Sequence, residues 1–169
     1  PLYAIVEDSQ VDPSAMEDVI VGCVSQAGEQ SNQIGRTAVL ASNLPQRVPA
    51  VTIDRQCGSS QQSIQFAAQA IMSGTQDLVI AAGIESMSRC PMGINARAGK
   101  VFDVPTHPTP QSVKDRFGIR HFSQFVGAEM IAKKYGHTKE ALDAYSVRSH
   151  HRGRDARNAG AFDKEIVAI

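Results

Sequence analysis

The sequence predicts an α/β fold built on a mixed or parallel sheet. Three short apolar runs, each bounded by Gly, Pro or Asp, are typical of strands buried on both faces; they cover residues 19–24, 48–53 and 78–82. Helical patterns occupy the intervals between them, at residues 35–44 and 59–73. This alternation of strand and helix is what a mixed or parallel sheet requires.

The second half of the chain predicts a long loop, two helices and a last strand. Residues 86–121 contain four prolines and no clear periodicity, which indicates a loop of a length that is usually functional. Residues 124–135 and 139–158 read as helices, the second of them capped by Thr138. Residues 165–169 are expected to begin another strand.

Composition excludes several classes of function. The 169 residues include 17 basic and 17 acidic side chains, so the formal net charge is zero. This balance lacks the positive charge that nucleic-acid binding requires, and we expect no nucleic-acid partner. No apolar run approaches the ~20 residues of a membrane span, and the first residues do not have the pattern of a signal peptide. We therefore expect a protein with no membrane association.

Cysteine usage points to a reducing compartment. The three cysteines are odd in number and lack C-x-x-C spacing, so they predict neither a disulfide framework nor a zinc site. We expect no bound metal. A cytoplasmic location is favoured, with an organelle matrix as the alternative.

The segment that follows the second predicted strand is unusual. No charged residue occurs between positions 56 and 76, although the helical period is kept. Its glutamines at 61, 65 and 69 form an i, i+4 stripe that is too polar for lipid. This predicts a buried helix lying between protein layers, with amides that need partners inside the fold.

Cys57 stands where the strand at 48–53 passes into this helix, followed by Gly58, Ser59 and Ser60. Amide groups and the positive dipole end at a helix N-terminus favour a thiolate and can hold an oxyanion. The position is therefore suited to a nucleophile. A free cysteine is also often a small buried hydrophobic residue, and this is our interpretation of Cys23 and Cys90.

Two motifs make the prediction specific. Asp-Arg-Gln-Cys-Gly-Ser-Ser at 54–60 precedes the Gln- and Ala-rich helix, and Ala-Ala-Gly-Ile-Glu-Ser-Met-Ser follows at 81–88. Together they resemble the thiolase family of acyl-CoA acyltransferases. Matching segments at 12–24, 147–150 and 160–166 appear in thiolase order, so the resemblance covers essentially the whole chain. The Glu-Ser-Met-Ser segment favours a thiolase over the related ketoacyl synthases.

The resemblance implies a thiolase-like half, in which helices cover both faces of a mixed sheet and the nucleophile lies at the N-terminus of a buried helix. Residues 1–169 would form an N-terminal domain that lacks its first strand and the C-terminal half. Cys57 would take the acyl group as a thioester. Acyl-CoA and coenzyme A would be substrates, with no cofactor permanently bound. A homo-oligomer, with a dimer favoured, is implied by the length of the loop before residue 121.

The sequence also departs from the family pattern. Asp54 and Ser60 replace a common Asn and Gly beside the nucleophile, and Gln124 and Phe125 stand where the acyl-pocket wall is expected. Gln124 and Phe125 are therefore our candidate substrate-binding residues. The family's Gly-His-Pro, second-cysteine and Asn-Glu segments do not occur in this sequence, so we expect the chain alone to be inactive. The alternative function is a non-catalytic thiolase-like binding or scaffold protein.

Overall fold

The computed structural model describes residues 1–104 and 108–168. The chain divides into two compact units, Pro1–Pro108 and Thr109–Ile169, and each is described by itself.

The first unit is an α/β unit organised around a parallel sheet. Its strands are ordered β2-β1-β3, and both strand pairs are parallel. The antiparallel strand that a mixed sheet would need is not among the described residues. The strands are β1 (Asp18–Gly22), β2 (Ala50–Ile53) and β3 (Val79–Gly83). The helices of this unit are α1 (Leu2–Ser9), α2 (Ile34–Leu40), α3 (Ser59–Met72) and α4 (Ile94–Val101), with short 3-10 turns at Pro13–Ala15 and Gly28–Gln30.

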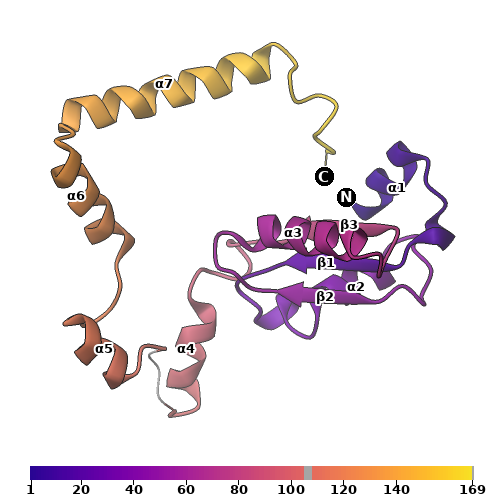
Figure 1. Cartoon of the computed structure of the whole chain (residues 1–169), viewed down its shortest axis with the longest axis horizontal. Helices are drawn as coiled ribbons and strands as arrows, with labels where there is room; N and C mark the ends of the chain where they lie inside the picture. Colours follow the sequence, from indigo (N-terminus) through magenta and orange to yellow (C-terminus); the bar gives the residue numbers. More distant parts are fainter. Residues whose placement is uncertain (105–107, 169) are drawn as a thin grey trace. The chain divides into compact units, whose positions relative to one another are not determined.

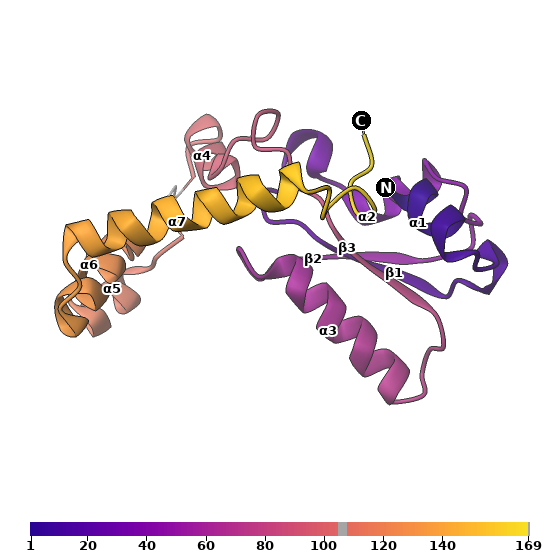
Figure 2. The same cartoon turned by 90° about the horizontal axis from the view of Figure 1, so that it is seen from above.

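Helices cover both faces of this sheet, as the sequence predicted (Figures 1 and 2). On one face, the Gly35 amide of α2 donates to Thr52 Oγ1 at 3.1 Å. On the other, Ser60 of α3 lies against Gly83. Thr52 pairs with Val21 of β1 and Gly83 pairs with the next residue, Gly22. Because successive residues of a strand point to opposite faces, α2 and α3 lie on opposite faces of the sheet.

The main apolar core lies on the α2 face. It joins Val19 and Val21 of β1 to Val39 of α2 and Val6 of α1. Val19 is completely buried because β1 is the central strand and has neighbours on both sides. Val39 of α2, in the same core cluster, is also completely buried. β2 is less protected than predicted: none of its residues is fully buried, since it lies at the edge of the described sheet.

The second unit contains helices with little burial. It comprises α5 (Gln111–Phe117), α6 (Gln124–Tyr135) and α7 (Lys139–Asn158). Within these three helices, all of which are described, no residue is buried. Thr138 caps α7 by accepting a hydrogen bond from the Ala141 amide at 3.2 Å, and α6 and α7 have the predicted bounds.

Four sequence predictions need correction. The region 86–121 is not a continuous loop, because it contains α4 and α5. The N-terminal helix α1 was not predicted, although its apolar residues recur at helical spacing. No strand forms within residues 165–168, and residue 169 lies outside the described residues. Finally, α3 is not enclosed: its glutamine stripe at 61, 65 and 69 is exposed in this chain.

Candidate functional site at the carboxyl edge of the sheet

Cys57 lies in a tight turn that joins β2 to α3. The Asp54 carboxylate accepts a hydrogen bond from the Gln56 amide at 2.7 Å, and Gln56 adopts a left-handed conformation with φ 48°. The Ser59 hydroxyl accepts from the Arg55 amide at 2.9 Å and donates to the Gln56 carbonyl at 2.6 Å. These bonds close the turn and leave Cys57 exposed.

The start of α3 immediately follows Cys57. Gly58 is the N-cap and provides no side-chain hydrogen bond to the helix. Its amide and that of Ser59 donate to the Arg55 and Gln56 carbonyls, each at 3.1 Å. The positive end of the helix dipole favours negative charge at this position. The Asp54 carboxylate, which departs from the family pattern, is held in this turn by the Gln56 amide. The geometry places the exposed Cys57 thiol beside a helix N-terminus.

Two glycines, Gly22 and Gly83, support the start of α3, and we call them the glycine pair. They are partners in the β1–β3 register. A Cβ on Gly22 would stand 2.5 Å from the Ser59 carbonyl carbon, and one on Gly83 would stand 2.0 Å from the Ser60 hydroxyl oxygen. The buried Ser63 hydroxyl lies 2.9 Å from the Ala82 carbonyl oxygen and fastens the next turn of α3 to β3.

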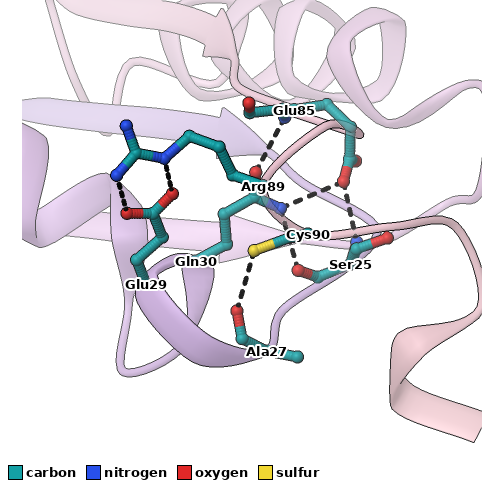
Figure 3. A network of polar contacts seen from close by, with 8 residues as sticks. Ser25, Ala27, Glu29, Gln30, Glu85, Arg89 and Cys90 are labelled. Carbon is teal, nitrogen blue, oxygen red and sulfur yellow. Dashed lines mark hydrogen bonds and ion pairs between the residues drawn. The ribbon is translucent and has the colours of Figure 1, made fainter. Parts of the chain in front are cut away.

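A network of polar contacts braces the same edge of the sheet (Figure 3). The Glu85 carboxylate follows β3 and accepts hydrogen bonds from the amides of Val24 at 2.8 Å and Ser25 at 3.1 Å. A third bond comes from the side-chain amide of Gln30 at 3.1 Å. Burial alone would raise the pKa of Glu85, but the bonds from Val24, Ser25 and Gln30 hold it below its ordinary value of 4.5. Glu85 is therefore ionised at neutral pH.

Gln30 and Ser25 are the buried residues of this hydrogen-bond network, each with 3% of its surface exposed. The side chain of Gln30 makes further bonds. Its amide nitrogen also donates to the Ser25 carbonyl at 2.9 Å, and its amide oxygen accepts from the Ser86 amide at 2.7 Å. Beside it, Glu29 and Arg89 form an exposed two-bond ion pair, in which one contact measures 2.6 Å. Gln30 thus joins the loops after β1 and β3 at several points, whereas the Glu29–Arg89 pair adds little because both side chains are exposed to solvent.

The two other cysteines are enclosed. Cys23 is 1% exposed and Cys90 is 2% exposed. Burial, followed by the nearby charge of Glu85, raises the pKa of the Cys23 thiol above its ordinary value of 9.0. The Cys90 thiol donates to the Ala27 carbonyl at 3.3 Å. Both fit the structural role expected from the sequence.

Gln124 and Phe125, the candidate substrate-binding residues, begin α6 in the second unit. Both are exposed, Phe125 to 86%. Ser123 caps the helix by accepting from the Val126 amide at 3.4 Å. An apolar hollow beside them is lined by residues that include Phe122, Val126 and Met130, but not by Gln124 or Phe125. Their role at an acyl pocket stays a prediction.

Sequence reasoning identified Cys57 but missed the glycine pair and Gln30. Gly22 and Gly83 each end a strand, and that position was the available indication of a close backbone approach. Gln30 had no indication in the sequence, since its partners Glu85 and Ser86 lie about 55 residues further along the chain. Among the described residues, no cluster of three His, Cys, Asp or Glu side chains is placed to hold a metal ion.

No helix in the described part of the chain combines the length and apolar character needed to cross a membrane.

Comparison with known proteins gives a consistent family. Residues 2–169 match the family described as "Thiolase, N-terminal domain". The chain is 44% identical over 167 residues to the steroid 3-ketoacyl-CoA thiolase FadA6 of Mycobacterium tuberculosis. The matched residues make up 98% of this chain and 41% of that protein. It is 40% identical over 166 residues to a 3-ketoacyl-CoA thiolase of a Shewanella species, and 35% identical over 164 residues to one of Colwellia psychrerythraea. These matches cover 98% and 97% of this chain and 40% of each relative. The chain therefore spans about two-fifths of the length of the curated relatives it matches.

Proposed function

The chain belongs to the thiolase family as an N-terminal thiolase domain, and we propose on that basis that Cys57 is the nucleophile of an acyl transfer to and from coenzyme A. The observation that carries this proposal is the exposed thiol of Cys57 at the N-terminus of α3, on the carboxyl edge of a parallel sheet. Ligands of open α/β sheets bind at that edge.

In the proposed reaction, the Cys57 sulfur attacks the 3-keto carbon of a 3-ketoacyl-CoA. A carbon–sulfur bond forms, and the bond between the α-carbon and the keto carbon breaks. The released enolate takes up a proton and leaves as acetyl-CoA. The thiol of a second coenzyme A then attacks the thioester, gives up its proton, and releases an acyl-CoA shortened by two carbons while Cys57 is regenerated. Two acyl transfers thereby replace one difficult carbon–carbon cleavage.

The substrate class follows from the relatives. Those compared above are named for 3-ketoacyl-CoA thiolysis, which supports thiolysis over acetyl-CoA condensation for the whole protein. Coenzyme A would enter as a substrate, not as a resident cofactor. Three cysteines that are all free in the structure are typical of a reducing compartment, which supports the cytoplasm, with an organelle matrix as the alternative.

A homodimer is part of the same proposal. β2 is the terminal strand of the described sheet, and Val51 on it is 38% exposed. An unpaired strand edge favours pairing with another chain. Pairing of two β2 edges would cover this strand and place two Cys57 turns near one interface.

The test uses the protein in its complete reading frame. Purified wild type, Cys57→Ser and Cys90→Ser are compared for coenzyme A-dependent cleavage of a 3-ketoacyl-CoA, and the acylated cysteine is mapped by mass spectrometry. We expect turnover and a Cys57 thioester in wild type, and loss of both in Cys57→Ser. Cys90→Ser keeps a hydroxyl donor for Ala27 and should retain activity.

Two outcomes would contradict the proposal. Full activity of Cys57→Ser would remove Cys57 from the reaction. Absence of any acyl-enzyme in a folded wild type that still binds acyl-CoA would favour the binding or scaffold function instead. Residues 1–169 alone should show no turnover, because a nucleophile without a base and oxyanion partners loses most of its rate enhancement.

A further inference from the structure

We infer that Glu85, together with Gln30, is a positioning residue for the Cys57 nucleophile. Glu85 is assigned no bond-making step by the reaction above. This inference rests on the proposed function, because a nucleophile has to be positioned only if it reacts. Three linked sets of contacts run from Glu85 to the turn containing Cys57.

The first set joins the loops after β1 and β3. Glu85 receives three hydrogen bonds, from Val24, Ser25 and Gln30. Gln30 in turn holds the Ser25 carbonyl and the Ser86 amide. Within the described residues no buried side-chain polar atom lacks a partner. Gln30 and Ser25 are buried, whereas Glu85 is exposed, and these three hydrogen bonds hold its carboxylate against the two loops.

The second set connects these loops to the glycine pair. The Ile84 amide, next to Glu85, donates to the Gly22 carbonyl at 2.9 Å. The Cys23 amide, next to Val24, donates to the Ile53 carbonyl at 2.9 Å. These two backbone bonds join the ends of all three strands, and the Glu85–Val24 bond ties the residues that directly follow β1 and β3, next to the end of β2 that leads into the Cys57 turn.

The third set runs from the glycine pair to Cys57. Ser59 and Ser60 lie so close to Gly22 and Gly83 that a single methyl group would not fit between them. A change in the spacing of the glycine pair therefore moves the first turn of α3. The Ser59 hydroxyl holds the Arg55 amide and the Gln56 carbonyl, so the turn that carries Cys57 moves with it. A displacement of about 1 Å at a reacting group can cost about 10²-fold in rate.

If Glu85 acted on Cys57 through its charge, removing that charge would change the reactivity of Cys57 in the opposite direction from a positioning role. A carboxylate near a sulfur nucleophile opposes the thiolate, so removing its charge would increase the reactivity of Cys57. A positioning role predicts that the same change lowers the reactivity. Glu85→Gln separates the two, because glutamine keeps the shape of the side chain but places an NH₂ group against one of the two backbone amides.

The experiment compares wild type, Glu85→Gln and Glu85→Asp in the complete protein, with Glu29→Gln as the matched control. Glu29→Gln makes the same chemical change one residue from Gln30, but the bonds of Glu29 go to the Arg89 side chain, whereas those of Glu85 come from loop backbone and Gln30. The probe is acetyl-CoA in a single turnover, and the rate of Cys57 acylation is measured. In parallel, iodoacetamide labelling of Cys23, Cys57 and Cys90 is followed by mass spectrometry.

We expect acylation of Cys57 to fall about tenfold or more in Glu85→Gln, with the single-turnover rate at saturating acetyl-CoA reduced more than the half-saturating concentration is changed. Cys23 and Cys90 should stay unlabelled, which shows that the fold is intact. Glu85→Asp keeps the charge but is one methylene shorter, and should lie between wild type and Glu85→Gln. Glu29→Gln should match wild type.

Acylation of Glu85→Gln at or above the wild-type rate would overturn the inference. So would labelling of Cys23 and Cys90 in step with the loss of acylation in both Glu85 variants, because Glu85 would then only hold the fold together. If wild type itself is not acylated, the proposed function fails. In that case the rate of iodoacetamide labelling at Cys57 tests the positioning role of Glu85 by itself. Equal labelling rates in wild type and Glu85→Gln would overturn that role as well.

Discussion

Gly22 lies directly beneath Ser59: a Cβ at position 22 would stand 2.5 Å from the carbonyl carbon of Ser59 and 2.6 Å from the next backbone nitrogen. Such distances are well inside van der Waals contact, so the hydrogen of glycine is the largest group that fits. The atoms in the way belong to backbone, which cannot rotate aside as a side chain does. The position of Cys57 therefore depends on a residue that is 35 positions earlier in the chain.

Gly22→Ala should destabilise the protein by about 1–3 kcal/mol, the usual cost of overpacking a fitted contact. Gly83→Ala should cost less, because the nearest atom there is the Ser60 hydroxyl oxygen, which can move. The matched control is Gly127→Ala on α6, where a Cβ meets nothing within 4 Å and alanine favours the helix. Urea unfolding of the three variants measures the order. Equal stability of Gly22→Ala and Gly127→Ala would show that α3 does not rest on this glycine.

Cys57 should be the first cysteine to react with a small alkylating reagent in the folded protein. It is exposed, whereas Cys23 and Cys90 are almost completely buried. Mapping of labelled peptides over time measures the order, and the same reaction in denaturant shows that all three thiols are competent. Earlier labelling of Cys23 or Cys90 would contradict the site assignment.

Glu85 should make stability depend on pH in the acid range. Its pKa is lower in the folded state than the ordinary value of 4.5 expected on unfolding. The stabilisation is therefore fully present above pH 4.5 and is lost as the pH falls through the folded pKa. Glu85→Gln should melt at a lower temperature than wild type at neutral pH, and this difference should shrink below pH 4.5. A constant difference in Tm at all pH values would show that the charge of Glu85 contributes nothing.

The chain of 169 residues should self-associate in solution. Ile64 and Ile71 lie seven positions apart on the outer face of α3 and are 60% and 47% exposed, which is an unusual apolar surface for a monomer. Light scattering should show a species larger than a monomer, and Ile64→Glu should shift it toward the monomer without loss of helix signal in circular dichroism. Val147→Glu on α7 is the control for added charge alone. A monodisperse wild-type monomer would contradict this expectation.

Much of the secondary structure could be predicted because local chemistry determines it. Both α6 and α7 begin after a Ser or Thr that caps the first turn, and the predicted bounds of these helices are confirmed. The prediction of a long loop at 86–121 was wrong because α4 and α5 are short helices near prolines. Helices of seven or eight residues are too short for a helical period to stand out in the sequence. The last strand was wrong for a different reason, since a strand requires a partner that a sequence pattern does not reveal.

The candidate site was predictable only in part. A cysteine between a strand and a helix can be recognised locally, and the structure places Cys57 in that turn. The contact of Gly22 with Ser59 and the bond of Gln30 to Glu85 join residues that are far apart in sequence. They depend on the register of parallel strands, which is set by the packing of the whole sheet. The role of Cys57 in acyl transfer stays a prediction.

The central place of β1 has a consequence for the newly made chain. β1 pairs with β3 as well as with β2, and Val24 and Glu85, just beyond the ends of β1 and β3, are 61 residues apart. At translation rates of roughly 5–20 residues per second, β3 leaves the ribosome on the order of several seconds after β1. Throughout that interval, one edge of the strand that is most buried in the folded protein has no partner. A nascent chain of this protein should therefore bind chaperones most strongly until residue 85 has emerged, and a ribosome pause before that point should increase aggregation.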